Sequence, residues 1–145
     1  MVDDDQKMQE MLMEILTDKG YSVTCVGTGK LAVAESFKRL YNLAFIDIRL
    51  PDMKGTELLS KLRKTEPDMI KIIITGNPTL DNSIEATNKG IDGYIVKPFD
   101  PKKLINLIEV KLKDQQKKIQ FDEKKVAEYI EQRHEWMANA NLKKQ

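Results

Sequence analysis

The chain has 145 residues, enough for one ordinary domain with an extension. Hydrophobic residues make up 41% of it, which allows a packed core, and a net charge of +1 gives no overall basic surface for nucleic acid. No apolar stretch approaches the roughly 20 residues of a membrane span, and the acidic N-terminus argues against a signal peptide. We therefore expect a soluble, cytoplasmic protein.

The single cysteine, Cys25, lies in the apolar run 21–26. One cysteine cannot form an intrachain disulfide, which fits a reducing cytoplasm. Its apolar surroundings favour a buried, unreactive thiol over a redox role.

The first segment consists of Val2 followed by three acids, residues 3–5. A helical spacing of apolar residues follows over 6–19 and ends at Gly20, a residue typical of a helix C-terminus. Asp5 is placed to cap that helix. Only two residues precede the acids, fewer than the roughly five of a typical strand. Either the numbered chain lacks upstream residues, which we favour, or another segment covers the gap.

Up to residue 112, short apolar runs alternate with helical patterns. Runs rich in β-branched and aromatic residues are typical of buried strands in a parallel sheet. Thr28 can cap one helix, Gly55 begins another, and Pro101 suits a first helical turn. This alternation predicts a doubly wound α/β fold. The predicted strands are 21–26, 43–47, 71–75 and 94–96, and the further helices are 28–37, 55 to about 67, 80–89 and one from about 102.

Polar residues suited to handling a phosphoryl group follow these apolar runs. Asp47, Thr75 and Lys97 each stand at the end of a predicted strand, and the acids 3–5 follow Val2. Ligands of an open α/β sheet bind outside the carboxyl ends of the strands. We therefore expect the four sites to converge although they are far apart in the sequence.

The same residues carry a family resemblance. The acids 3–5 are followed in order by FIDIRLPDMKG at 45–55, Thr75-Gly76, and YIVKPF at 94–99. Each motif alone is a weak signal, but all of them in register at strand ends form a specific one. From Val2 to about Leu112 the chain resembles the receiver domain of two-component response regulators, as a chemotaxis-regulator-like, stand-alone receiver with a C-terminal helical extension.

The resemblance implies a fold and a division of the chain. The implied fold is a flavodoxin-like, doubly wound sheet of five parallel strands in the order 2-1-3-4-5. Residues 1–112 would form the receiver, or phosphoacceptor, domain with an apparently truncated first strand. Residues 113–145 would form a charged helical extension.

The acidic residues predict a metal site. Acids that face one another commonly persist by binding a cation, and Mg²⁺ prefers oxygen ligands. By the family pattern, Asp4 and Asp47 ligate Mg²⁺ directly, the backbone carbonyl of Arg49 supplies a third protein oxygen, and Asp3 acts mainly through water. The alternative is that residues 3–5 are only a helix N-terminal acid cluster favoured by the helix dipole.

Four residues have expected roles in phosphoryl chemistry. Asp47 is the expected phosphoacceptor, because a carboxylate can attack phosphorus once the charges are neutralised. Lys97 should reach Asp47 and then a phosphoryl oxygen, and the family's Lys-Pro bond is typically cis. Thr75 offers a hydroxyl to a phosphoryl oxygen, and Tyr94 is the aromatic that in this family turns inward with that threonine. The alternatives are a solvated surface lysine and a core tyrosine without a switching role.

Other motifs fit less well. Residues 27–30, GTGK, lack the upstream glycine and the following Ser/Thr of a P-loop, and Asp47 has no second aspartate two residues on, as haloacid-dehalogenase-type phosphatases require. His134 is the only histidine, so no histidine-based triad or histidine-rich metal site is expected. Arg49 and Asn77 lie two residues past Asp47 and Thr75, where side chains tend to flank a phosphate.

The expected function is a phosphorylation-operated switch in phosphorelay signalling rather than a metabolic enzyme. A histidine kinase would phosphorylate Asp47 with Mg²⁺, and a face that includes the Thr75 loop, the helix 80–89 and Tyr94 would then bind an output protein. The alternatives are a scaffold receiver that is not phosphorylated and an N-terminal fragment of a longer transcriptional regulator. No DNA reader or membrane segment is expected in this chain.

The C-terminal residues show a change of pattern. From Lys111 on there are nine Lys or Arg and six Asp or Glu, a surplus of three positive charges. Residues 113–118 are fully polar and suit a linker or a solvated helix. From Asp122, a candidate helix cap, apolar residues recur at helical spacing, which predicts an amphipathic helix that needs a partner. We expect self-association through this helix or the receiver face, or contact with another protein, and a charged disordered tail is the alternative.

Overall fold

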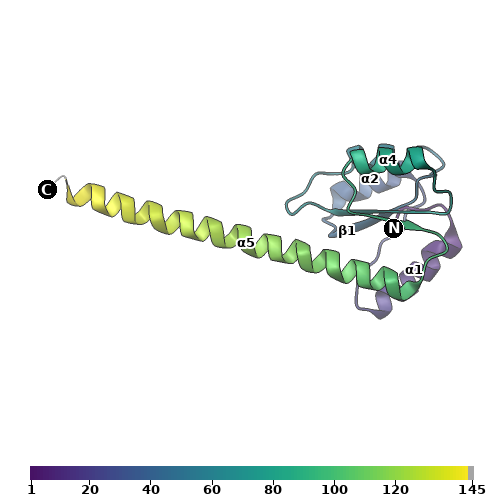
Figure 1. Cartoon of the computed structure of the whole chain (residues 1–145), viewed down its shortest axis with the longest axis horizontal. Coiled ribbons are helices and arrows are strands. Elements are labelled where there is room, and N and C mark those ends of the chain that lie inside the picture. Colours follow the sequence, from purple (N-terminus) through teal and green to yellow (C-terminus); the bar gives the residue numbers. More distant parts are fainter. Residues whose placement is uncertain (144–145) are drawn as a thin grey trace. The chain divides into compact units, whose positions relative to one another are not determined.

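The computed structural model describes residues 1–143. The chain divides into two compact units, Met1–Leu112 and Lys113–Gln145, called below the N-terminal unit and the tail. Within the described residues two helices come first, then strands and helices alternate up to a long last helix (Figure 1). In order they are α1 (Gln6–Asp18), α2 (Gly29–Lys38), β1 (Leu43–Ile46), α3 (Gly55–Lys61), β2 (Ile70–Thr75), α4 (Leu80–Asn88), β3 (Gly93–Val96) and α5 (Pro101–Leu142).

The sheet of the N-terminal unit is parallel. Its strands lie in the order β1-β2-β3, with Phe45 opposite Ile72 and Ile73 opposite Tyr94. Val2 adds one parallel bridge to Val26 and another to Ile46. The predicted α/β fold with a parallel sheet is therefore confirmed, and the first residues of the chain lie beside β1.

Two of the predicted strands do not form as ladders. Residues 21–25 have no strand conformation, and Val26 and Val2 contribute only isolated bridges, so the five-stranded order is not confirmed. The physical reason is the short partner, because only two residues precede the acids and a ladder needs consecutive pairs on both sides. Val2 is nevertheless 5% exposed, and its N–H donates to the carbonyl of Phe45 at 2.8 Å.

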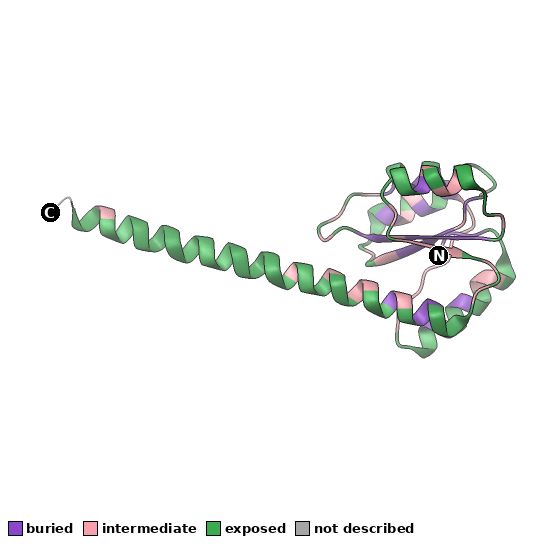
Figure 2. Ribbon diagram, viewed as in Figure 1, coloured by how far each residue is buried: buried purple, intermediate pink, exposed green. Residues whose placement is uncertain are grey.

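Apolar side chains cover both faces of the sheet. On β1, Ala44 and Ile46 point to the face covered by α2 and α3, whereas Phe45 points to the face covered by α1 and the start of α5. The alternation follows from the two-residue period of a strand. Figure 2 shows the buried residues on the strands and on the helix faces that contact them. The sheet is therefore packed between two layers of helices, and its strand ends are left free for polar residues.

The helix termini follow the sequence signals. Asp5 accepts hydrogen bonds from the N–H groups of Lys7 and Met8, and Thr28 accepts one from Leu31, as expected for N-caps. Gly20 and Gly90 follow α1 and α4 with φ angles of 86° and 79°, which a side chain disfavours. Helix α3 ends at Lys61, several residues before Pro67, where the prediction had placed its end.

Helix α5 confirms that the C-terminal residues are helical and corrects the predicted start of that helix at Asp122. It runs without interruption from Pro101 to Leu142, so Asp122 lies inside a helix and does not cap a second one. Residues 113–118 contain strong helix formers and no Gly or Pro, so nothing in their sequence ends the helix. Among residues 1–143, no helix is long and apolar enough to cross a membrane.

Candidate functional site

Lys97 forms ion pairs with two of the predicted acids. Its Nζ lies 2.8 Å from Oδ2 of Asp3 and 3.0 Å from Oδ2 of Asp47. Asp3 follows Val2, Asp47 follows β1, and Lys97 follows β3, so the parallel strands carry all three to one edge of the sheet. The Asp3 side chain is only 1% exposed, compared with 13% for Asp47 and 17% for Lys97. The expected convergence of these strand ends is therefore observed.

The charges of this cluster are not balanced. Burial raises the pKa of Asp47 and the charge of Asp3 adds to this, while hydrogen bonds from Lys97 and from the backbone N–H of Arg49 oppose it. Burial lowers the pKa of Lys97, but the hydrogen bonds to Asp3 and Asp47 outweigh it, and the net pKa lies above the usual value. The pKa of Asp47 therefore lies above its usual value, mainly because of burial, although Lys97 binds this carboxylate.

The acids can hold a metal ion. Asp3, Asp4 and Asp47 each offer a carboxylate oxygen, and these oxygens lie within 4.8 Å of one another. Asp4 is exposed, so a cation and its water ligands can reach the cluster from solvent. Three carboxylates against one ammonium leave two negative charges, which a divalent cation would offset. Oxygen-only ligands suit Mg²⁺, so the donor set fits the ion that the family pattern implies.

Thr75 and its neighbours border the cluster. The Thr75 side chain, 1% exposed, accepts a hydrogen bond from the N–H of Asn77 at 3.1 Å. When the Asn77 amide is oriented with its oxygen toward Arg49, this oxygen accepts hydrogen bonds from the guanidinium, and Nε of Arg49 lies 2.9 Å from it. The backbone N–H of Arg49 donates to Oδ1 of Asp47 at 3.2 Å. The two side chains expected to flank a phosphate therefore bind each other beside Asp47.

Two glycines allow close approach of the backbone to this site. A Cβ on Gly55 would overlap the carbonyl oxygen of Asp47, and the N–H of Gly55 donates to the carbonyl of Ile48 at 2.6 Å. A Cβ on Gly76 would meet only the side chain of Lys97, at 3.7 Å and more. The close packing of Gly55 on the Asp47 backbone therefore requires a residue without a Cβ. A Cβ on Gly76 would fit beside Lys97 in ordinary van der Waals contact.

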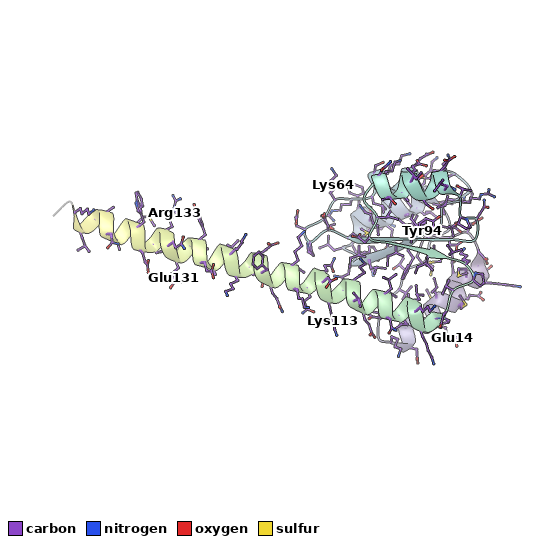
Figure 3. All side chains as sticks on the ribbon, viewed as in Figure 1. Glu14, Lys64, Tyr94, Lys113, Glu131 and Arg133 are labelled. Atoms are coloured by element: carbon purple, nitrogen blue, oxygen red, sulfur yellow. The ribbon has the colours of Figure 1, made fainter. Side chains whose placement is uncertain are left out.

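Tyr94 does not belong to the charged cluster. It lies on β3 (Figure 3). There it is half-buried, packs with the core on the α2 and α3 side, and pairs with Ile73 in the sheet. Thr75, two residues after Ile73, therefore projects from the same face of the sheet as Tyr94. Within the described residues, the hydroxyls of Tyr94 and Thr56 are buried without a hydrogen-bond partner. Burying a hydroxyl without a hydrogen-bond partner costs free energy, so the present side-chain conformation of Tyr94 is less stable than one in which its hydroxyl is paired.

Sequence reasoning missed two contacts of the site. Lys97 binds Asp3 as well as Asp47, although Asp3 was expected to act mainly through water on a metal. Asp52 accepts from the N–H groups of Gly29 and Lys30 at 2.9 Å and so joins the loop after Asp47 to the start of α2. An acid in a Pro-Asp turn is a typical signal for local capping, but nothing in the sequence pairs it with a helix more than twenty residues away.

Solved structures resemble this fold. A CheY-like receiver domain protein from Methanospirillum hungatei is 43% identical with a TM-score of 0.77, over 81% of this chain and 94% of that chain. The chemotaxis protein CheY4 of Vibrio cholerae is 26% identical with a TM-score of 0.69, over 74% of this chain and 92% of that one.

Curated relatives match about 70% of the chain. The transcriptional regulatory protein PmrA of Pectobacterium parmentieri is 37% identical over 68% of this chain and 44% of its own length. The luminescence regulatory protein LuxO of Vibrio campbellii is 32% identical over 72% of this chain and 23% of its own length. The chain thus spans less than half the length of these relatives. Residues 1–109 match the response regulator receiver domain, and the chain therefore belongs to that family of two-component systems.

Proposed function

We propose that the chain is a phosphoacceptor switch in which Asp47 receives the phosphoryl group from a histidine kinase. The observation that carries this proposal is the pair of contacts from Lys97 to Asp47 and Asp3 at the carboxyl edge of the sheet. A carboxylate held by one ammonium and set beside two further acids suits acceptance of a phosphoryl group once a cation is present.

The transfer involves the P–N bond of a phosphohistidine. An oxygen of Asp47 attacks the phosphorus, the P–N bond breaks, and the imidazole keeps the bonding electrons and takes up a proton. An acyl phosphate then remains on Asp47. A Mg²⁺ ion held by Asp3, Asp4 and Asp47, with the backbone carbonyl of Arg49, would supply positive charge for this reaction. This chain's own role is to orient Asp47 and to hold the phosphoryl oxygens.

Lys97 and Thr75 hold the product in this proposal. The ammonium of Lys97 already lies 3.0 Å from Asp47 and exchanges part of that contact for a phosphoryl oxygen. Thr75 accepts from the N–H of Asn77, which leaves its own O–H to donate to the phosphoryl group. Both groups approach Asp47 from strands β2 and β3, so the phosphate joins three strand ends.

The switch couples Thr75 to Tyr94. The two side chains share a face of the sheet, and movement of Thr75 toward the phosphate changes the space beside Tyr94. The unpartnered hydroxyl of Tyr94 makes its present position one that a small change can shift. The face that includes the Thr75 loop, α4 and Tyr94 then binds an output protein, and the chain acts as a signalling module rather than as an enzyme.

The remaining predictions belong to the same proposal. The hydrogen bonds of Val2 and Asp3 to Phe45 and Val26 support the family's order 2-1-3-4-5, with residues 1–3 as the first strand and 24–26 as the second. Residues 1–112 then form the receiver. A cytoplasmic location remains our expectation from the single cysteine. The length of the curated relatives favours a second candidate, the receiver part of a longer transcriptional regulator.

A small donor with a P–N bond tests the proposal. The purified chain is incubated with phosphoramidate, and the intact mass is measured with Mg²⁺ and with an excess of EDTA. We expect the mass of one phosphoryl group with Mg²⁺ and little or none with EDTA. No gain of mass in either condition would favour the scaffold receiver that is not phosphorylated.

A further inference from the structure

The tail keeps large apolar side chains in solvent. Val126, Tyr129, Ile130, Trp136 and Met137 are between 41% and 70% exposed, and no residue from 113 to 143 is buried (Figure 2). A single helix with an uncovered apolar stripe is marginal in water, because helix stability comes mainly from packing of that stripe. The stripe therefore needs a partner.

Three of these residues, Val126, Tyr129 and Trp136, belong to a row of residues that repeats every seven positions, and Ile130 and Met137 flank that row. Spacings of four and three alternate along the row, called here the seam, and this is the pattern of helices that pair by coiling. Two charged residues, Asp122 and Arg133, interrupt the seam. Burying either charge between two paired helices costs free energy unless it lies against an opposite charge. In order, the seam residues are Gln115, Ile119, Asp122, Val126, Tyr129, Arg133, Trp136 and Ala140.

The seam is complementary to itself in the reversed direction. When two copies are aligned antiparallel about a two-fold axis between residues 127 and 128, Val126 meets Tyr129 of the second copy. In the same alignment Ile119 meets Trp136, and Arg133 meets Asp122. Every contact occurs twice, because a two-fold interface presents the same surface on both chains. We propose that the tail binds a second copy of this chain in this antiparallel register.

The parallel register is unfavourable for the same residues. It would place Asp122 against Asp122 and Arg133 against Arg133, so that both charged layers become repulsive. Opposing like charges at an interface suppress that arrangement, whereas the antiparallel register forms two ion pairs. Glu123 lies beside Asp122 and adds a second acid near Arg133. The charged residues of the seam therefore select the direction of pairing.

The charge of the whole segment agrees with this direction. Residues 113–127 contain five Lys and three acids, a net charge of +2, and residues 128–142 contain one Arg and three Glu, a net charge of −2. Antiparallel pairing sets each positive half against a negative half. Glu131 and Arg133 project from opposite sides of the helix, so Glu131 contributes to this long-range attraction without entering the seam (Figure 3).

The first test measures association of the full chain by sedimentation over about 1 to 100 μM. We expect a monomer–dimer equilibrium. Arg133→Glu should raise the dissociation constant at least about tenfold, because it sets acid against acid twice. The exchange of both charges, Arg133→Glu with Asp122→Arg, should restore association. Glu131→Arg, a reversal outside the seam, should change the dissociation constant by no more than about threefold.

The second test measures direction with spin labels in a Cys25→Ser background. Labels are attached to Lys117→Cys or to Ala138→Cys, two positions on the outer side of the helix. In the antiparallel pair, residue 117 of one copy lies level with residue 138 of the other. Like labels are then offset by about 31 Å along the axis, and mixing the two labelled chains adds a distance without this offset.

Three results would overturn the proposal. The first is a monomer over the whole concentration range, whether the tail is solvated or docks on its own chain. The second is a dimer whose like labels show no axial offset, which would indicate parallel pairing. The third is a dimer that Arg133→Glu leaves unchanged, which would place the contact elsewhere, for example on the receiver.

Discussion

The N-terminal unit buries its apolar side chains on both faces of a sheet, whereas the tail leaves its apolar side chains exposed. Leu12, Ile46, Ile72 and Leu104 are no more than 1% exposed, but Trp136 is 70% exposed. Both regions have regular secondary structure and a clear spacing of apolar residues. The spacing of apolar residues thus predicts a helix in either place, but only burial fixes which side chains meet. The proposed phosphoryl chemistry requires such fixed contacts.

If buried contacts matter more than exposed ones, substitution of Lys97, the one ammonium of the cluster, should have the largest effect on stability and on phosphorylation. Lys97→Ala leaves Asp3, 1% exposed, without its ion-pair partner and should lower the free energy of unfolding by about 3 kcal/mol. Phosphorylation should slow by about 100-fold or more, because the charge opposite Asp47 is lost. Urea unfolding and intact mass measure the two effects.

Lys38→Ala is the matched control for a surface ion pair. Lys38 pairs with Glu35 at 3.8 Å with its side chain 72% exposed, and its loss should change the unfolding free energy by less than about 1 kcal/mol. Equal losses for the two variants would mean that the buried cluster is no more important to stability than a surface pair.

A smaller effect is expected from Gly55→Ala. The new Cβ would overlap the carbonyl oxygen of Asp47, so the backbone must move, at about 2 kcal/mol of stability. The displaced Asp47 should also accept the phosphoryl group more slowly. Thermal unfolding and the phosphorylation rate are compared with those of Gly76→Ala, whose Cβ has ordinary space beside Lys97. If both alanines unfold alike, close packing on the Asp47 backbone does not matter.

Two neighbouring acids separate metal binding from helix capping. Asp4→Ala should lower Mg²⁺ affinity about tenfold and slow phosphorylation, with little change in stability, because Asp4 is exposed. Asp5→Ala should keep the Mg²⁺ affinity and lose about 1 kcal/mol of stability, because Asp5 caps α1. Mg²⁺ titrations by calorimetry measure the affinities, and identical titrations for wild type and Asp4→Ala would remove Asp4 from the metal site.

The smallest effect on the chemistry is expected from deletion of the residues after Lys118. Of these residues the structure describes 119–143, and none of them is buried, so the phosphorylation rate with a small donor should stay within about twofold of the full chain. The same deletion should abolish association of two chains. Rate and sedimentation are measured on the same preparation, and a strong loss of phosphorylation would show that the tail takes part in the chemistry.

The sequence predicted those features that depend on local signals or on strand order. As expected, Asp5 and Thr28 cap the N-termini of α1 and α2, and Gly20 follows the C-terminus of α1. These features are predictable because capping involves residues within one turn of the helix end. The convergence of Asp47 and Lys97 followed from parallel strands that end at one edge.

Other features depend on contacts that no local pattern contains. Asp52 binds the start of α2 across the fold, and the tail continues α5 because no residue ends that helix. The shortness of the first segment was visible in the sequence, but the partners of Val2, Val26 and Ile46, are set by the fold. The sequence also did not determine which of the acids 3–5 forms the ion pair with Lys97, because the three neighbouring aspartates cannot be distinguished by their local sequence.

The most direct test of the account is whether Asp47 carries the phosphoryl group. Wild type and Asp47→Asn are incubated with acetyl phosphate and Mg²⁺, and intact mass is followed over time. The account predicts one phosphoryl group on the wild type and none on Asp47→Asn, whose fold is retained because Asn keeps the shape and relieves the crowding of negative charge around Asp3. A folded Asp47→Asn that gains the same mass at the same rate would contradict it.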